Sequence, residues 1–224
     1  MRWAVACLIH RQFISVKSNL VGDDQGRGEA REANIGELLI TLLFDLVASS
    51  VMEPKDGADN ILETERLVLR QMTLADVDAL MDIFSDPEAM RYYPSTKSRD
   101  EAEGWVRWVQ HSYEENGFGL WAAILMETGE FTGQCGLMPQ QVEGHREVEI
   151  GYMFLRRFWG RGLATEAAYA ARSYGFRRLG LDRLVSLIDP ANVPSKRVAE
   201  RVGMKFEKQV NWHGKRICLY SITS

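Results

Sequence analysis

Cysteine is scarce in this sequence, which holds three among 224 residues, at positions 7, 135 and 218. The three are far apart, and none belongs to a CxxC pair or to a Cys/His cluster. This spacing argues against a disulfide framework and against a zinc site, so we expect no metal. It is typical instead of a protein from a reducing compartment.

A surplus of basic residues is lacking too. Lysine and arginine number 27 against 31 acidic residues, which gives a formal net charge of −4 and a pI near 5.7. Proteins that bind nucleic acid neutralise its phosphates with clustered basic residues. We therefore expect no nucleic acid among the partners of this protein.

Long uninterrupted apolar runs are also missing. The first residues, MRWAVACLIHRQF, resemble a signal peptide, but His10 and Arg11 break the apolar run and no clean cleavage site follows. A second run, residues 35–51, contains Glu37 and Asp45 and is shorter than the ~20 apolar residues that span a bilayer. We therefore expect a cytoplasmic protein that does not bind a membrane.

The sequence does contain enough apolar material for a folded core, since 46% of its residues are hydrophobic and 26% are charged. Its character changes near Met52, where a polar lead-in precedes the first strand-like segment. We expect residues 1–58 to be an N-terminal extension, dispensable or translated from an over-called start, and residues 59–224 to be one domain. The alternative is an extension that supplies an extra helix to cover an exposed apolar face.

The hydrophobic pattern after residue 63 changes repeatedly between the periods of a strand and of a helix. This order predicts an α+β domain, with a mostly antiparallel sheet flanked by helices and one β-α-β crossover in its second half. The expected strands are residues 66–71, 118–126, 133–138, 147–155, 183–188, 205–209 and 216–222, and the expected helices are residues 74–84, 98–115, 163–179 and 195–202.

A glycine turn connects the strand and the helix of the crossover, in the sequence Arg157-Phe-Trp-Gly160-Arg161-Gly162. Glycines allow a backbone to direct several N–H groups at one point, and the start of the next helix adds partial positive charge. Such a turn binds an anion such as a pyrophosphate, with help from the two arginines. An ordinary strand-to-helix turn would also contain glycine, so the two glycines alone are weak evidence.

A dinucleotide fingerprint is the sharper alternative, because Gly160-x-Gly162-x-x-Thr165 nearly matches GxGxxG and Asp189 follows at a plausible distance. Three features count against it. Threonine replaces the third glycine, and four residues, Arg156-Arg157-Phe-Trp, separate the strand from the glycines. The preceding strand also alternates in polarity, whereas a parallel Rossmann strand is continuously apolar.

From this turn outward the sequence resembles the GNAT superfamily of N-acetyltransferases, and within it the RimJ/RimL-like branch of ribosomal-protein acetyltransferases. The acyl-CoA signature of the superfamily, (Gln/Arg)-x-x-Gly-x-(Gly/Ala), is matched by Arg157-x-x-Gly160-x-Gly162. Further matches follow in the family's order over residues 60–222. They are Glu63-Thr-Glu-Arg-Leu-Val-Leu-Arg, Gly133-Gln-Cys-Gly136-Leu, Glu149-Ile-Gly151-Tyr, Ala164-Thr165-Glu166-Ala167, and Asn192-x-x-Ser195 leading to Gly203-Met-Lys-Phe.

The resemblance implies a GNAT-like fold and an enzyme that moves the acetyl group of its cosubstrate, acetyl-CoA, directly to an amine. Backbone groups at the end of one strand would pair with the pantetheine arm, and the following turn would bind the pyrophosphate. Asn192 resembles the asparagine that binds pantetheine in the family, although loop and cap positions commonly hold asparagine. The strand residues are Met153, Phe154 and Leu155, and the turn residues are Arg157, Phe158, Trp159, Gly160, Arg161, Gly162, Leu163, Ala164 and Thr165.

A general base is expected near the acetyl group, because most amines are protonated at neutral pH and only the neutral amine attacks a thioester. Glu149 is the first candidate, because Glu-Ile-Gly-Tyr at this position resembles the family pattern that contacts the amine or its water. Glu147 is the second candidate, on the same face of the strand. The alternative for Glu149 is a solvent-facing side chain on an amphipathic strand.

The thiolate of coenzyme A leaves in this reaction, and a proton donor near the sulfur would stabilise it. Ser195 matches the serine that some RimL-like enzymes use, while capping the following helix is its alternative role. Tyr220 is a weaker candidate because its spacing fits the family poorly. Cys135 could form an acetyl-enzyme, but a buried structural cysteine is the expected role.

The acceptor is an amine that the sequence leaves open, on a protein N-terminus or on a small molecule. Trp105, Trp108, Tyr92 and Tyr93 lie in a segment that often contributes to the acceptor site in this family, although aromatic residues at helical spacing usually form core. The protein is expected to be a monomer or a homodimer. A sensor that binds acyl-CoA without turnover is the other function that an intact signature would fit.

Overall fold

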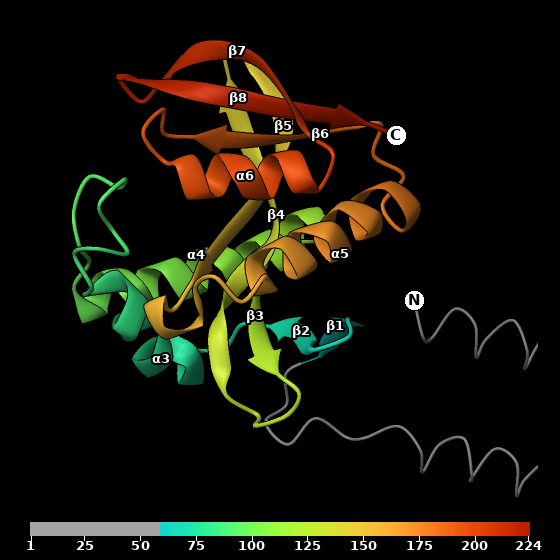
Figure 1. The fold of residues 1–224 in the computed structure, drawn as a ribbon. Helices are drawn as coiled ribbons and strands as arrows, with labels where there is room; N and C mark the ends of the chain where they lie inside the picture. The colour runs from blue at the N-terminus through green and yellow to red at the C-terminus, as the bar shows by residue number, and fades with distance from the viewer. Residues whose placement is uncertain (1–58) are drawn as a thin grey trace, which may run out of the picture. The chain divides into compact units, whose positions relative to one another are not determined.

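The computed structural model describes residues 59–224, so the expected extension, residues 1–58, lies outside the described residues. One eight-stranded sheet organises the described chain, in the order β1-β2-β3-β4-β5-β6-β8-β7 (Figure 1). All neighbouring strands are antiparallel except β5 and β6. The strands are β1 (Asn60–Glu63), β2 (Leu67–Gln71), β3 (Leu120–Leu125), β4 (Phe131–Val142), β5 (His145–Phe154), β6 (Arg183–Ile188), β7 (Lys205–Trp212) and β8 (Lys215–Thr223).

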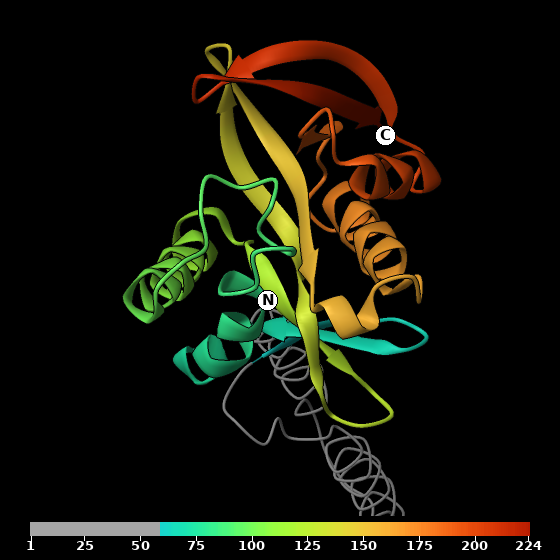
Figure 2. The ribbon, with the colours of Figure 1, turned by 60° about the vertical axis from the view of Figure 1, so that its left-hand side comes forward.

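Helices cover both faces of the sheet. Figure 2 shows α3 and α4, in green, on one face, and α5 and α6, in orange, on the other. Most of the buried apolar side chains form one large core cluster between these layers. A smaller cluster of Val142, Val185, Val210, Ile217 and Leu219 connects the far end of β4 with β6, β7 and β8. The helices are α3 (Val77–Phe84), α4 (Arg99–Asn116), α5 (Leu163–Arg177) and α6 (Val193–Arg201).

Local sequence signals explain where the helices begin and end. At α4, the Ser98 hydroxyl accepts from the Glu101 backbone N–H at 3.3 Å, and the Glu101 carboxylate accepts from the Ser98 N–H at 2.7 Å. This capping box satisfies two backbone donors that the helix leaves free. Helix α4 ends at Gly117, whose φ of 75° is a left-handed conformation that glycine adopts without strain.

Small residues bring α5 close to the sheet. Its buried face consists of Leu163, Ala167, Ala168, Ala171 and Gly175. A Cβ at Gly175 would lie 3.1 Å from the Leu184 Cδ1 of β6, so a larger residue there would push the helix away. This close packing places the start of α5 against the end of β5, where the glycine turn lies.

The expected α+β class, with its mostly antiparallel sheet and single parallel crossover, is confirmed. Two of the differences from expectation concern whole strands or long extensions. Strand β1 was not predicted, and β4 continues to Val142 instead of ending near residue 138. Pro139 normally argues against a strand interior. It is tolerated here because its nitrogen faces the β3 side of β4, and β3 begins only at Leu120, which pairs with Gly136, so it has no residue opposite Pro139.

Candidate active site

Strands β5 and β6 separate shortly after they meet. Within residues 59–224 their parallel ladder consists of one registered pair, Glu149 with Val185. Beyond this pair, side chains form hydrogen bonds with the backbone groups that would otherwise continue the ladder. The Leu187 N–H donates to the Glu149 carboxylate at 3.2 Å, and the Ile150 carbonyl accepts from the Ser186 hydroxyl at 2.9 Å. The result is an opening between two strands of one sheet.

The edge of β5 that borders this opening has the properties of an edge strand. The Leu155 N–H donates to the Thr132 carbonyl on the β4 side at 2.9 Å. Because backbone groups alternate along a strand, those of Phe154 and Tyr152 then face the opening. The Phe154 carbonyl accepts there from the indole N–H of Trp159 at 2.7 Å. Of the three expected strand residues, Phe154 therefore faces the opening, whereas the backbone groups of Met153 and the Leu155 N–H face β4.

The glycine turn follows directly. Gly160 and Gly162 have φ values of 76° and 80°, so both positions require the left-handed conformation that favours glycine. Nothing lies within 4 Å of a Cβ built at Gly160, so the surface there is open to a ligand. Helix α5 starts at Leu163, and its first N–H groups have no partner within the helix. This combination of open turn and helix start fits a pyrophosphate.

An ion pair that the sequence analysis missed holds the turn in place. Arg66 contacts Glu166 of α5 at 2.6 Å and also donates to the Arg161 carbonyl at 2.9 Å. The Thr64 hydroxyl donates to Glu166 at 2.6 Å. Burial acts to raise the pKa of Glu166, but the hydrogen bonds from Thr64 and Arg66 outweigh it and lower that pKa. These contacts fix the start of α5 to the residues immediately before β2.

The two arginines of the turn differ in their surroundings. The Arg157 guanidinium contacts the Glu130 carboxylate at 2.6 Å and lies 3.8 Å from that of Asp82. Arg161 lies over the Phe158 ring at 5.1 Å and has no carboxylate partner within the described chain. Arg161 is therefore the more available cation for a phosphate, and the role of Arg157 in phosphate binding stays a prediction.

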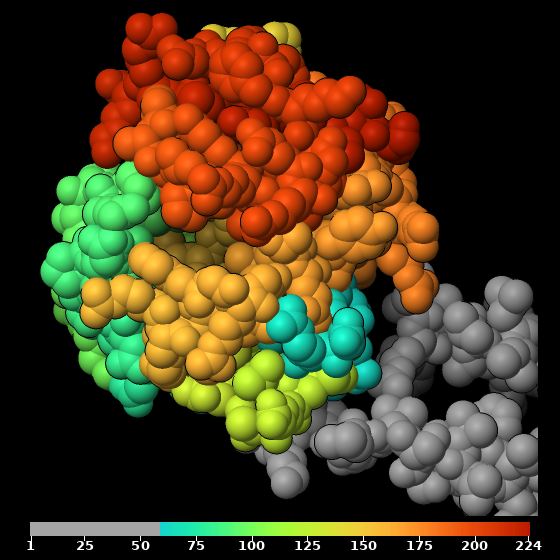
Figure 3. Space-filling view, viewed as in Figure 1, coloured from blue at the N-terminus to red at the C-terminus, as the bar shows by residue number. Residues whose placement is uncertain are grey.

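Glu149 lies where the two strands separate (Figure 3 shows the hollow between α6 and the turn before α5). Its carboxylate accepts from the Gln140 amide at 2.7 Å as well as from Leu187. Burial raises the pKa of Glu149 to about 7, although both hydrogen bonds act in the opposite direction. The pKa of Tyr93 is raised to about 12, first by desolvation of its hydroxyl and then by the Glu149 charge, while 44% of the residue's surface is exposed.

Ser195 and Tyr152 form the opposite side of the site. The Tyr152 hydroxyl lies 3.0 Å from the Ser195 hydroxyl and 2.9 Å from the Ser195 carbonyl. Asn192 is the N-cap of α6, where its side chain accepts from the Ser195 N–H at 3.1 Å. The suggested capping role of Ser195 was therefore wrong, because the helix begins two residues earlier, at Val193. Sequence reasoning missed Tyr152, which lies 43 positions from its partner.

The other candidates have structural roles. Glu147 forms an ion pair with Arg183 at 3.1 Å, so its carboxylate is already engaged. Cys135 is completely buried, and this burial raises the pKa of its thiol. Tyr220 is buried against the Phe206 ring at 5.8 Å. The Trp105 indole donates to Gln134 at 3.0 Å, which ties α4 to the sheet.

Two features are absent from residues 59–224. No helix there is both long and apolar enough to cross a bilayer. No group of three or more His, Cys, Asp or Glu side chains in the same residues is arranged to hold a metal ion.

Known proteins resemble this chain over most of its length. A family model described as an acetyltransferase (GNAT) domain matches residues 66–205. The uncharacterized protein YkkB of Bacillus subtilis is 44% identical over 165 residues, which cover 73% of this chain and 96% of that protein. The uncharacterized N-acetyltransferase p20 of Bacillus licheniformis is 35% identical over 150 residues, which cover 66% and 83%. A solved acetyltransferase from Agrobacterium tumefaciens aligns with a TM-score of 0.66 at 29% identity, and covers 77% of this chain and 98% of its own.

This chain belongs to the GNAT family of acetyltransferases. It is an N-acetyltransferase, and acetyl-CoA is the acetyl donor of this family. The strand before the glycine turn is antiparallel to β4 and not part of a parallel Rossmann sheet, which removes the fold that a dinucleotide site requires. The opening between β5 and β6, the edge of β5 that borders it and the open turn at Gly160 fit the pantetheine arm and the pyrophosphate of the coenzyme.

Proposed function

We propose that this protein transfers the acetyl group directly from acetyl-CoA to a primary amine, on a protein N-terminus or a small molecule. The observation that carries the proposal is the position of Glu149 at the opening between β5 and β6, with a pKa raised to about 7. A carboxylate with this pKa can take a proton near neutral pH, as a general base must. Membership of the RimJ/RimL-like branch is proposed on the ordered motifs of the sequence.

Acetyl-CoA, the amine and the side chains that line the opening together account for every bond and proton of the transfer. The thioester of acetyl-CoA supplies an acetyl carbon that is open to nucleophilic attack. The amine nitrogen bonds to that carbon, the carbon–sulfur bond breaks, and Glu149 takes the proton that the amine loses, directly or through water. Ser195, with its hydroxyl 3.0 Å from that of Tyr152, donates a hydrogen bond that stabilises the departing thiolate.

The strength of this base supports one class of acceptor over another. An α-amino group has a pKa of about 7.7–8.0, whereas a lysine side chain has a pKa of about 10.4. A base with a pKa of about 7 is closer to the first, so an N-terminal amine or a weakly basic small amine fits Glu149 better than lysine does. We propose that Tyr93, which is 44% exposed and whose pKa responds to the Glu149 charge, contacts the acceptor.

A turnover screen tests the proposal. Acetyl-CoA is incubated with the full chain and with panels of N-terminal peptides and small amines, and free thiol is measured. We expect turnover with at least one amine of low pKa and weaker turnover with lysine side chains. In parallel, acetyl-CoA should raise the melting temperature while NAD and NADP should not, because binding to the native state alone stabilises it. Binding without turnover on any amine would favour the sensor instead.

A further inference from the structure

The Glu149 carboxylate is held from two sides, by a side chain of β4 and by the backbone of β6. One of its oxygens accepts from the Gln140 amide at 2.7 Å, and the other accepts from the Leu187 N–H at 3.2 Å. Because each donor engages a different oxygen, the two bonds together fix both the position and the plane of the carboxylate. The Leu187 bond belongs to the backbone, whereas the Gln140 bond depends on the identity of one side chain.

Gln140 reaches Glu149 along a diagonal of the sheet. In the β4–β5 ladder, Met138 lies opposite Glu149, and Gln140 lies opposite Glu147. Long side chains can span the distance between diagonal neighbours on one face of a sheet. The Glu147 carboxylate, directly opposite Gln140, is paired with Arg183 at 3.1 Å. The Gln140 amide therefore donates to the carboxylate of the candidate base and not to the residue that it faces.

Two tyrosines interact electrostatically with Glu149, and both are uncharged near neutral pH. Desolvation of the hydroxyl is the larger cause that raises the pKa of Tyr93, to about 12, and it also raises the pKa of Tyr152; the Glu149 charge acts in the same direction on both. Burial raises the pKa of Glu149 itself to about 7, while the bonds from Gln140 and Leu187 act to lower it. The proton affinity of this carboxyl is therefore a balance between burial and two neutral donors.

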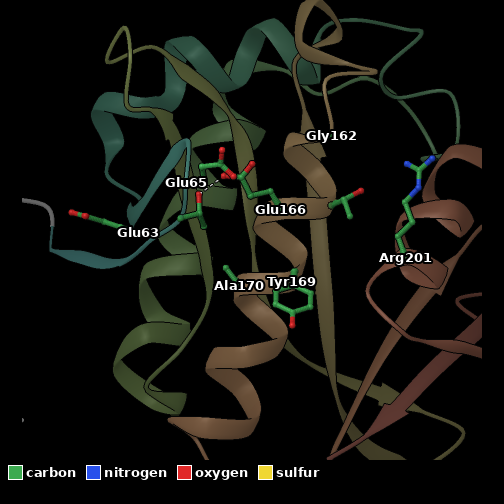
Figure 4. A pocket seen from close by; sticks show the side chains of 9 residues that line it. Glu63, Glu65, Gly162, Glu166, Tyr169, Ala170 and Arg201 are labelled. Atoms are coloured by element: carbon green, nitrogen blue, oxygen red, sulfur yellow. Dashed lines mark hydrogen bonds between the residues drawn. The ribbon is translucent and has the colours of Figure 1, made fainter.

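A second partly buried carboxylate shows what a charged donor does. Glu166 lies on α5, in the wall of a surface cavity (Figure 4). Burial acts to raise its pKa, but hydrogen bonds from Thr64 at 2.6 Å and from the Arg66 guanidinium at 2.7 Å together lower it. Glu149 is more strongly desolvated, and its two donors are neutral amides. A neutral donor holds this carboxylate and still leaves it basic enough to take a proton near neutral pH.

We propose that Gln140 is a positioning residue for the acetyl transfer, which holds the Glu149 carboxylate together with Leu187 and sets the pH range in which it accepts the amine proton. The proposal rests on Glu149 as the general base, and Gln140 acts through it without touching the reacting atoms. The glutamine amide also has an acceptor oxygen beside its donor. After a half-turn of the amide, that oxygen can accept from the carboxyl once Glu149 is protonated, so one side chain serves both states of the base.

The pH dependence of kcat/KM distinguishes this role from a structural one. Gln140→Leu removes the donor without adding charge, so the acid limb should move up by roughly one pH unit, as loss of a hydrogen bond to a charged group implies. At pH 7 kcat/KM should then fall about fivefold, and the loss should shrink as the pH rises. Gln140→Lys places a cation beside the carboxylate and should move the limb down instead. Gln141→Leu is the matched control, because Gln141 is exposed on the opposite face of β4, and it should leave the limb in place.

Urea denaturation tests the same contact without any turnover. The free energy of unfolding falls as the pH rises from the ordinary carboxyl value of 4.5 through the native pKa of Glu149. Gln140→Leu raises that native pKa further, so this variant should lose more stability between pH 5 and pH 9 than the unmodified protein, and Gln140→Lys should lose less. In a Glu149→Gln background neither substitution should change the pH dependence. Melting temperatures confirm that each variant is folded, and if Gln140→Leu does not fold, Gln140→Lys gives the same test with the opposite sign.

Two results would overturn the role of Gln140. One is an acid limb that stays in place in the Gln140 variants, with turnover lowered equally at every pH, as a structural role predicts. The other is a change in the pH dependence of unfolding that persists in the Glu149→Gln background. Absence of turnover with every amine would contradict the proposed function instead, and the urea comparison would still decide whether Gln140 controls the proton of Glu149.

Discussion

Glu149 on β5 accepts a hydrogen bond of 3.2 Å from the backbone N–H of Leu187 on β6, immediately past the pair that joins the two strands. A side chain thus replaces a carbonyl as the acceptor for a strand N–H. The same carboxylate that ends the ladder therefore lies at the opening between the strands. The proton chemistry of Glu149 and the shape of the opening are therefore linked through one side chain.

Glu149→Gln should lower kcat by roughly 10²–10⁴-fold, as expected for loss of a general base, while the affinity for acetyl-CoA changes little. Raising the pH should partly rescue this variant, because more of the amine is then neutral. In the unmodified enzyme kcat/KM should fall below pH 7, following the pKa of about 7, and this limb should be absent from the variant. Glu147→Gln is the matched control, because Glu147 lies two positions before Glu149 on the same face of β5. Wild-type turnover in Glu149→Gln at neutral pH would show that the base is wrong.

The stability of the fold should also depend on Glu149. Its carboxyl has a pKa of about 7 in the native state and an ordinary value of 4.5, so between these values the native state holds a proton that the unfolded chain has lost. The free energy of unfolding should therefore fall as the pH rises from about 4.5 through about 7. Urea denaturation at pH 5 and pH 8 should show a smaller loss for Glu149→Gln than for the unmodified protein. An equal loss in both would contradict the raised pKa.

Ser195→Ala and Tyr152→Phe should each lower kcat by less than Glu149→Gln does, and a higher pH should not rescue them. Both hydroxyls belong to one hydrogen-bonded pair at 3.0 Å. The double variant should therefore be little slower than the worse single variant, because effects within one unit do not add. Steady-state kinetics of the three variants across pH gives the comparison. Additive losses would mean that the two hydroxyls act separately.

Gly160→Val should weaken the binding of acetyl-CoA more than tenfold, or abolish it, as measured by calorimetry. The variant adds a branched side chain at the open surface of the turn, and a φ of 76° costs such a residue roughly 1–2 kcal/mol. Gly214→Val separates strain from ligand contact, because Gly214 has a φ of 77° and equal free space in the β7–β8 hairpin. This control should lose similar stability and keep its affinity. Weakened binding in both variants would point to strain alone.

A chain that begins at Met52 should fold and bind acetyl-CoA with the affinity of the full chain. The family match, residues 66–205, and the whole described sheet lie after this position. Circular dichroism, thermal melting and calorimetry compare the two chains. An insoluble short chain, or one that ignores acetyl-CoA, would make residues 1–51 part of the working protein.

Local signals in the sequence predicted most of the fold. The order of helices and strands, the class of sheet and the position of the glycine turn all depend on patterns within about ten residues. Where the end of a strand differs from the predicted one, the cause lies in the neighbouring strand of the sheet. Strand β4 continues through Pro139 because no strand lies opposite its nitrogen, a fact that depends on where β3 begins.

Contacts between distant residues could not be read from a single sequence. The Arg66–Glu166 pair that fixes the turn spans 100 positions, and the Tyr152–Ser195 pair spans 43. The pattern Arg157-x-x-Gly160-x-Gly162 likewise gave no sign that the Arg157 guanidinium would contact Glu130. A motif gives the type of a charged residue and its position in the chain. The partners of Arg157, however, depend on the packing of α3 and the β3–β4 hairpin.

The single backbone pair between β5 and β6 has a consequence for how the molecule opens. On one side of it lie β1 to β5, and on the other lie β6, β8 and β7, which are joined to the first group through α5 and the apolar cluster around Val142 and Val185. With so few backbone bonds across this seam, the C-terminal strands can fluctuate as a cooperative unit of their own. In the proposed binding mode, a donor molecule seated in the opening would contact both groups. It would then act as a removable ninth strand that couples their motions while it is bound.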